Sequence, residues 1–264
     1  MDSQDLEKLS KDSGLTEREL QEFYNRRKSI IWVIRLKYKV RGVESVTFGT
    51  GFSVSSDGLI FTSAHFFPKT SYTIDVRRLE EVGSHSANVV YEKPKWDITL
   101  LQVIDVNDCQ YATLTDNDSL SVAQTLLHIG NPDNFVGSFL VGKVAFGCVD
   151  DIEIPIGSVT CRTYAPTAME TPPKFRIMGD VWNEHVLGNS SVGKSFEKNL
   201  HPCTPIIQMY GLICGEGSSG GPVFNVKGEV VGMVSGSASG YEYAIHVAML
   251  REILKLFKEQ NPGN

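Results

Sequence analysis

Short apolar runs recur along most of the chain, and their period is that of strands rather than helices. Residues 30–34 are continuously apolar, which favours a central strand, and charged and apolar positions then alternate over residues 35–40, as in a strand with one buried face. Similar runs follow at short spacing, at residues 46–54, 58–63, 72–76, 87–91 and 98–104. Closely spaced strands of this kind are typical of a β-barrel, and the first barrel is expected to end near residue 115.

A second set of apolar runs predicts a second barrel. It begins at residues 125–130 and is followed by the turn Asn131-Pro132-Asp133. The other strands of this barrel are expected near residues 138–147, 206–214, 222–226 and 229–235. Within this set, the strand pattern weakens over about 149–205, where several prolines interrupt the chain.

Helical patterns lie at the two ends of the chain. Residues 1–28 are polar, and Thr16-Glu17-Arg18-Glu19 fits a capping box, so this lead is predicted to be helical. It is interpreted either as a packing or oligomerisation element or as a solvent-facing arm. Residues 248–259 carry an apolar stripe that predicts a helix packed on a barrel. We therefore divide the chain into a helical extension (1–28), a first barrel (29–115) and a second barrel with the closing helix (116–264).

Overall composition excludes few classes of function. The 264 residues carry a net charge of −6 without a dense basic patch, which argues against a nucleic-acid partner. Apolar runs stay short of the ~20 residues that a membrane-spanning helix needs, so no membrane role is expected. The acidic start of the chain has neither the apolar segment of a secretory signal nor the Arg-rich character of a transit peptide.

The cysteines add an expectation about compartment and metals. There are 5 of them, scattered along the chain, and none forms a C-x-x-C pair. This pattern favours reduced thiols over a disulfide framework and indicates no zinc site, so neither a metal nor a cofactor is expected. Together with the missing signal pattern, it predicts a cytoplasmic protein, with the nucleus left open.

Three segments carry candidate chemistry. The run Gly217–Pro222 places Ser219 on a glycine-rich turn between two apolar runs, and such a turn leaves backbone N–H groups free to face a ligand. His65 ends one predicted strand, and Asp97 begins another, where its carboxylate is expected to be buried and paired. A hydroxyl, an imidazole and a carboxylate are the groups of nucleophilic acyl transfer. A glycine-serine cluster alone is more often a simple loop, so the interpretation depends on all three segments.

These segments resemble motifs of the chymotrypsin/trypsin superfamily of serine proteases. Thr62-Ser63-Ala64-His65 is similar to its histidine motif, Asp97-Ile98-Thr99-Leu100-Leu101 to its aspartate motif, and Gly217–Pro222 to its nucleophile motif. The segments 49–52 and 232–236 also resemble family strands, and the order His, Asp, Ser agrees. The resemblance implies an all-β fold of two six-stranded antiparallel β-barrels.

Within the superfamily, the chain looks most like the Deg/HtrA-type proteases. The interval of 32 residues between His65 and Asp97 and the absence of a disulfide pattern both fit that branch. The interval of 122 residues between Asp97 and Ser219 departs from it and implies an insertion over about 149–205. No PDZ-like domain is expected after residue 264.

The resemblance assigns roles to individual residues. Ser219 would attack the substrate, His65 would take its proton, and Asp97 would orient the imidazole. The backbone N–H groups of Gly217 and Ser219 would form the oxyanion hole, and Ser235 would support Asp97.

The resemblance also implies substrate-binding residues. Ser235 and Gly236 would pair with an extended substrate. Ile213 matches the floor of the specificity pocket, which predicts cleavage after medium apolar residues. Glu216, at the pocket rim, either tunes charge preference or is merely solvated.

Two functions follow from these roles. The first is a serine endopeptidase that acts on polypeptides, and the alternative is a binding scaffold that keeps the fold with little or no turnover. Because His65, Asp97 and Ser219 are all present, the enzyme is favoured, and labelling by a fluorophosphonate would discriminate the two. His128 and His246 lie in apolar runs and are predicted to be packed rather than catalytic.

Overall fold

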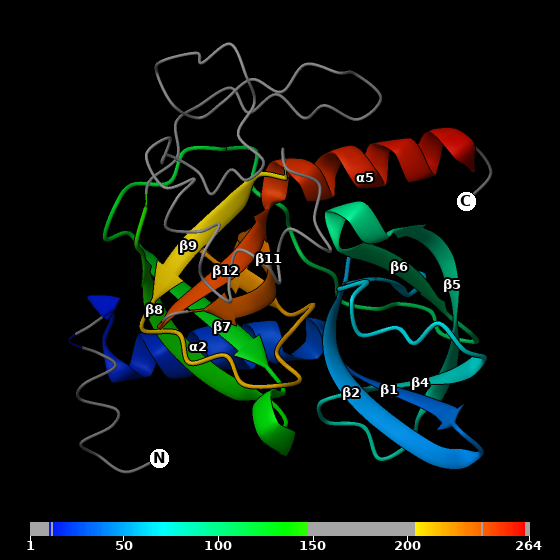
Figure 1. Ribbon diagram of the computed structural model, residues 1–264. Coiled ribbons are helices and arrows are strands. Elements are labelled where there is room, and N and C mark those ends of the chain that lie inside the picture. Colours follow the sequence, from blue (N-terminus) through cyan, green and yellow to red (C-terminus); the bar gives the residue numbers. More distant parts are fainter. Residues whose placement is uncertain (1–10, 12, 147–203, 239, 262–264) are drawn as a thin grey trace, which may run out of the picture.

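The protein consists of two β-barrels that lie side by side in the computed structural model (Figure 1). The structure describes residues 11, 13–146, 204–238 and 240–261. Each barrel is closed, antiparallel and six-stranded, which confirms the predicted fold class. The insertion expected over about 149–205 lies outside the described residues except for its last two positions.

The first barrel has the strand order β1-β2-β3-β6-β5-β4. Its strands are β1 (Ile31–Val40), β2 (Val43–Ser53), β3 (Leu59–Thr62), β4 (Tyr72–Arg78), β5 (His85–Lys93) and β6 (Ile98–Val103). β1 and β2 form a long hairpin in which Arg35 lies opposite Phe48, whereas β2 pairs with β3 only from Gly51 to Ser53. The first half of β2 therefore projects past β3, and Phe48 is exposed there.

The second barrel has the strand order β10-β11-β12-β9-β8-β7. Its strands are β7 (Thr125–Gly130), β8 (Ser138–Val144), β9 (Ile206–Tyr210), β10 (Pro222–Phe224), β11 (Val230–Ala238) and β12 (Tyr241–His246). Three short 3₁₀ helices complete the described elements of the two barrels, at Lys28–Ile30 (η1), Pro94–Trp96 (η2) and Pro132–Asn134 (η3). The sequence pattern did not predict β12, because its apolar run is interrupted only by His246 before it continues into the following helix.

Helix α2 (Glu17–Arg27) docks on the second barrel although it precedes the first (Figure 1). Its predicted capping box is confirmed: the Thr16 hydroxyl accepts from the Glu19 N–H, and the Glu19 carboxylate accepts from the Thr16 N–H. Phe23 is buried, and its ring lies 5.5 Å from that of Phe224 on β10 and 5.9 Å from that of Phe139 on β8.

Helix α5 (Val247–Gln260) follows β12 directly and confirms the helix predicted over 248–259. Its buried stripe includes Met249, Ile253 and Phe257. The ring of Phe257 contacts that of Tyr91 on β5, with centroids 6.1 Å apart, so this helix reaches from the second barrel to the first. Among the described residues, neither long helix has the length and apolarity that crossing a membrane requires.

One hydrophobic cluster joins the two barrels. Phe52 and Phe61 of the first barrel belong to the same buried cluster as Phe224 and Met233 of the second. Burial of this kind stabilises by about 25 cal/mol per Å² of apolar surface removed from water. The barrels are therefore held against each other by a shared core.

Candidate active site

His65 and Asp97 lie together because their strands are neighbours in the first barrel. His65 comes three residues after β3, and Asp97 directly precedes β6. β3 and β6 pair antiparallel, with Thr62 opposite Thr99, so the end of one strand meets the start of the other. Asp97 follows η2 with φ +53°, a left-handed conformation that aspartate adopts more readily than most residues.

A chain of hydrogen bonds runs through the Asp97 carboxylate. His65 Nδ1 lies 2.9 Å from Oδ2 and 3.0 Å from Oδ1, and the His65 backbone N–H donates to Oδ1 over 2.8 Å. On the other side, the Ser235 hydroxyl of β11 donates to Oδ2 over 2.5 Å. Asp97 is 3% exposed, and these donors satisfy a charge that would be costly to bury alone. Because an ionised carboxylate only accepts, Nδ1 carries the proton and Nε2 of His65 is left as an acceptor.

Opposing effects set the pKa of His65. Burial lowers the pKa by disfavouring the imidazolium, whereas the hydrogen bond and the negative charge of Asp97 raise it. The net result is a pKa above the ordinary value of 6.5. An imidazole with a raised pKa is a stronger proton acceptor, which suits a general base.

Ser219 lies in a turn that is tied to both barrels. Its carbonyl accepts from the Thr50 N–H of β2 over 3.1 Å. The next residue, Gly220, donates its N–H to the Val234 carbonyl of β11 over 2.8 Å. These bonds fix the serine where the two barrels meet.

Gly217 has a conformation and neighbours that exclude a side chain. Its φ is +98°, and a Cβ at this position would collide with the carbonyl oxygen of Asn131. The preceding carbonyl, of Glu216, accepts from the Asp133 N–H over 2.7 Å. Because the C=O and N–H of a trans peptide point in opposite directions, this bond turns the Gly217 N–H away from Asp133.

The N–H groups of Gly217 and Ser219 have no acceptor in the part of the chain that the structure describes. The Gly217 carbonyl, by contrast, accepts from the Thr50 hydroxyl over 2.6 Å. Thr50 Oγ1 in turn accepts from the backbone and side-chain N–H groups of Asn131 at 3.1 and 3.0 Å. Two free donors beside a serine hydroxyl can bind an oxygen that develops negative charge.

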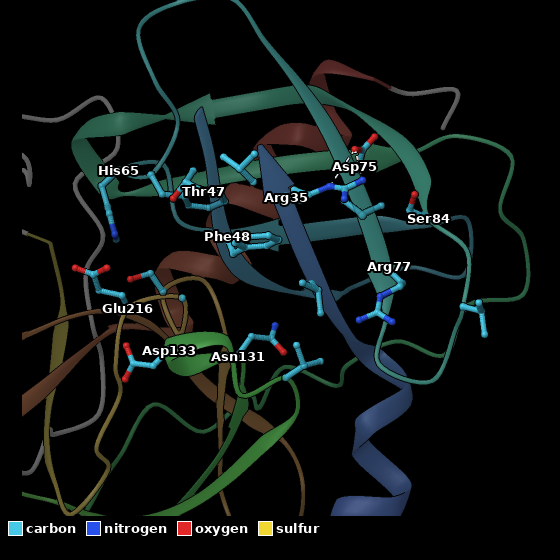
Figure 2. Close-up of a pocket in the computed structure, with 18 residues that line it drawn as sticks. Arg35, Thr47, Phe48, His65, Asp75, Arg77, Ser84, Asn131, Asp133 and Glu216 are labelled. Atoms are coloured by element: carbon cyan, nitrogen blue, oxygen red, sulfur yellow. Dashed lines mark hydrogen bonds and ion pairs between the residues drawn. The ribbon is translucent and has the colours of Figure 1, made fainter. Parts of the chain in front are cut away.

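His65, Gly217 and Ser219 line one cavity of about 940 Å³ (Figure 2). Residues of both barrels form its walls, with Glu216 and Asp133 on the side of the second barrel. Among the described contacts, no hydrogen bond joins the Ser219 hydroxyl to His65. Such a bond often forms only when substrate is present.

The predicted substrate-binding residues are placed less uniformly. Ser235 lies on β11 beside Asp97, and Gly236 pairs with Tyr243 of β12; neither lines the cavity. Ile213 is 80% exposed and is also absent from the cavity walls. A side chain in that position is not the floor of a closed pocket, so its placement gives no support to an apolar specificity pocket.

Sequence reasoning missed Thr50, Asn131 and Asp133 as site residues. The sequence pattern presents Thr50 only as part of a glycine-rich strand and residues 131–133 only as a turn. Their importance comes from hydrogen bonds to Gly217 and Glu216, far away in the chain. The available signal was a polar side chain between two glycines of a buried strand.

The prediction that His128 and His246 are packed is confirmed. Both are fully buried, and burial lowers the pKa of each to about 4. His128 Nδ1 lies 2.9 Å from the Pro222 carbonyl, to which the neutral ring donates. Both rings are therefore neutral at pH 7 and serve the core.

A double β-barrel with a histidine–carboxylate pair on one barrel and a serine turn on the other is the architecture of the chymotrypsin-like proteins. The family model described as a trypsin-like peptidase domain matches residues 49–233. This match covers more than half of the chain, and the chain belongs to the trypsin-like peptidase family.

Several curated proteins named "Probable periplasmic serine endoprotease DegP-like" are similar to the chain. The one from Bartonella henselae is 24% identical over 248 residues, which cover 91% of this chain and 38% of that protein. The one from Pseudomonas fulva is 26% identical over 221 residues, covering 81% of this chain and 36% of that protein. The chain thus spans little more than a third of the length of these relatives.

The names of these relatives contradict the predicted compartment. They place the relatives in the periplasm, whereas the sequence pattern predicted a cytoplasmic chain with the nucleus left open. That prediction depended on a missing signal pattern and an odd number of cysteines, and neither is a positive mark of a compartment. The prediction is wrong on this comparison, and we withdraw it.

Proposed function

We propose that this chain is a serine endopeptidase that hydrolyses peptide bonds of polypeptide substrates. One observation carries the proposal: His65, hydrogen-bonded to the buried Asp97, and the serine Ser219 line the same cavity. Membership of the trypsin-like peptidase family supports the same activity.

In the acylation step, the Ser219 hydroxyl attacks the carbonyl carbon of the substrate. His65 Nε2 accepts the hydroxyl proton as the Oγ–C bond forms, and Asp97 stabilises the resulting imidazolium. The substrate oxygen becomes an oxyanion that accepts from the N–H groups of Gly217 and Ser219. Each such donor contributes roughly 3–4 kcal/mol to transition-state stabilisation.

The remaining steps regenerate the free enzyme. The imidazolium of His65 gives its proton to the leaving amine as the C–N bond breaks, which leaves an acyl ester on Ser219. Water then attacks the ester, with its proton taken by His65, and the carboxylic acid is released as the Ser219 hydroxyl forms again. Besides the substrate and this water, these steps use side chains and backbone of this chain.

The proposal makes no choice of the residue before the cleaved bond. The preference for medium apolar residues rested on Ile213, whose exposed side chain gives it no support. Cleavage of a peptide library would decide this point, and a dominant medium apolar residue would restore the expectation.

The proposal is tested by labelling the chain with a fluorophosphonate, which reacts with activated serines. We expect labelling of the unmodified protein and none of Ser219→Ala, while Ser121→Ala, which removes an exposed serine away from the cavity, labels normally. The unmodified protein and the two variants, none of them treated with the label, are then compared for cleavage of an unfolded polypeptide. If Ser219→Ala and the unmodified protein behave alike in both assays, the endopeptidase proposal fails and the scaffold alternative takes its place.

A further inference from the structure

The cavity that holds His65 and Ser219 extends well beyond them, over the outer face of the first barrel. Its walls include residues of β1, β2 and β4, which are adjacent strands in the order β2-β1-β4. In Figure 2, Arg35, Asp75 and Arg77 lie on the side of the cavity away from His65 and Glu216. This part of the cavity has no role in the chemistry proposed above.

The strand register explains how these side chains come to share one face. Phe48 of β2 lies opposite Arg35 of β1, which lies opposite Asp75 of β4. One step along, Val33 of β1 lies opposite Arg77 of β4. Residues two apart in a strand point to the same face, so Asp75 and Arg77 project together into the cavity.

The charges on this face do not cancel. Asp75 accepts from both Lys37 and Arg35 at 2.7 Å, and these cations hold the pKa of its carboxyl below the usual range. Arg77, by contrast, donates one N–H to the Glu81 carbonyl over 3.0 Å and has no carboxylate partner among the described residues. Asp75 is thus paired with Arg35 and Lys37, and Arg77 is the cation of this face whose charge is left for a ligand.

The position of His65 indicates which part of a substrate would reach this face. His65 gives its proton to the leaving amine, so the segment after the cleaved bond departs past His65, which belongs to the first barrel. Two inter-strand spacings separate β2 from β4, roughly 10 Å at about 4.8 Å each. An extended chain covers that distance in about three residues.

We propose that Arg77 is a specificity-determining residue that binds an acidic side chain at the third to fifth position after the cleaved bond. This inference rests on the proposed endopeptidase function. The ligand is a carboxylate of the substrate polypeptide, which the guanidinium binds by charge-assisted hydrogen bonds. Exposed Val82 and Val136, which also line the cavity, flank the substrate chain on its way.

The test measures binding without turnover as well as cleavage. Two internally quenched peptides, amidated at the carboxyl end, differ only in carrying Glu or Gln at the third to fifth positions after the cleaved bond. Their Kd values are measured on the full chain with Ser219→Ala, and their kcat/KM values on the unmodified chain. We expect the Glu peptide to be preferred roughly tenfold in both assays at low salt, and the preference to shrink as ionic strength rises.

Variants connect the preference to Arg77. Arg77→Gln is expected to abolish the preference, Arg77→Lys to retain part of it, and Arg77→Glu to favour a matched Lys peptide. Lys39→Gln, which removes an equal charge from an exposed position of β1 outside the cavity, should leave the preference intact. Thermal unfolding of each variant checks that the protein is still folded without the hydrogen bond from Arg77 to the Glu81 carbonyl.

The possible outcomes distinguish failure of the carboxylate site from failure of the proposed endopeptidase function. Equal Kd values for the Glu and Gln peptides, or a preference that survives Arg77→Gln, would overturn the inference whether or not the chain is an enzyme. A Glu preference in binding by a chain that neither labels nor cleaves would overturn the endopeptidase proposal and leave the carboxylate site standing.

Discussion

The Asp133 N–H donates to the Glu216 carbonyl over 2.7 Å, and this bond sets the direction of the next peptide N–H, that of Gly217. Asp133 belongs to the short helix η3 and has φ +47°, a left-handed conformation. The loop between β7 and β8 therefore acts as a backbone support for the serine turn. The proposed oxyanion hole depends on this contact as much as on the turn itself.

Gly217→Ala is expected to lower kcat by roughly 10²–10³, because the added Cβ collides with the Asn131 carbonyl and displaces the N–H donor. The matched control is Gly42→Ala, a glycine of similar positive φ with open space around it. Both variants incur the backbone strain of about 1 kcal/mol, but only the first should lose activity. Steady-state kinetics and thermal unfolding distinguish the two effects, and equal activity of the two variants would contradict the assigned role of Gly217.

Asp97→Asn is expected to lower kcat/KM by roughly 10³–10⁴. The amide of Asn would donate to His65 Nδ1 and so place the proton on Nε2, the wrong tautomer for a base. In the unmodified protein, kcat/KM should fall as pH drops through a His65 pKa above 6.5, because the base becomes protonated. Activity that is independent of pH between 5 and 8 would exclude His65 as the base.

The contribution of His246 to the free energy of unfolding is expected to fall as pH drops from 6.5 to about 4. His246 has a pKa near 4 when folded and 6.5 when unfolded, so between these values the unfolded chain binds the extra proton. His246→Asn should reduce this slope by about 1.4 kcal/mol per pH unit, since Asn does not titrate and can still cap α5 as the His246 ring does through the Ala248 N–H. Urea unfolding over this pH range measures both slopes, and parallel curves would contradict the prediction.

Glu242 contributes the opposite pH dependence over an overlapping range. Burial raises its pKa to about 7, although the hydrogen bond that its carboxylate accepts from the Cys214 N–H lowers the pKa. Between pH 4.5 and 7 the folded protein holds an extra proton on Glu242, so the contribution of this group to the free energy of unfolding falls as pH rises, against the contribution of His246 below pH 6.5. Glu242→Gln should remove this contribution. The free energy of unfolding of the variant should therefore rise relative to that of the unmodified protein by about 1.4 kcal/mol per pH unit across that window. A constant difference between the two proteins would show that Glu242 is ionised throughout.

How far the sequence predicts this protein can be judged from particular residues. His65 and Asp97 were identified because each stands at the end of a clear strand pattern, where a polar residue is conspicuous. The strand β12 was missed because only His246 separates its apolar residues from those of α5, so the period changes inside one largely apolar segment. The role of Ile213 stays a prediction, because position along the chain says nothing of which way a loop side chain turns, and this side chain is exposed.

Contacts between distant segments were beyond reach for the same reason. The sequence around Arg77 does not show that this residue shares a cavity with Ser219. The sequence around Asp133 does not show that its N–H donates to the Glu216 carbonyl. Packing of the two barrels brings Arg77 and Ser219 to one cavity, whereas Asp133 and Glu216 meet within the second barrel, where β7 and β10 are neighbours.

The crossed attachment of the two long helices has a consequence for the alignment of the site. Phe23 of α2 is anchored on the second barrel, and Phe257 of α5 reaches the first, so each half of the molecule is gripped by a segment from the far end of the chain. His65 belongs to the first barrel and Ser219 to the second. Each helix contact therefore adds to the shared core in keeping the imidazole and the serine aligned, and it does so from a segment outside the strands of either barrel.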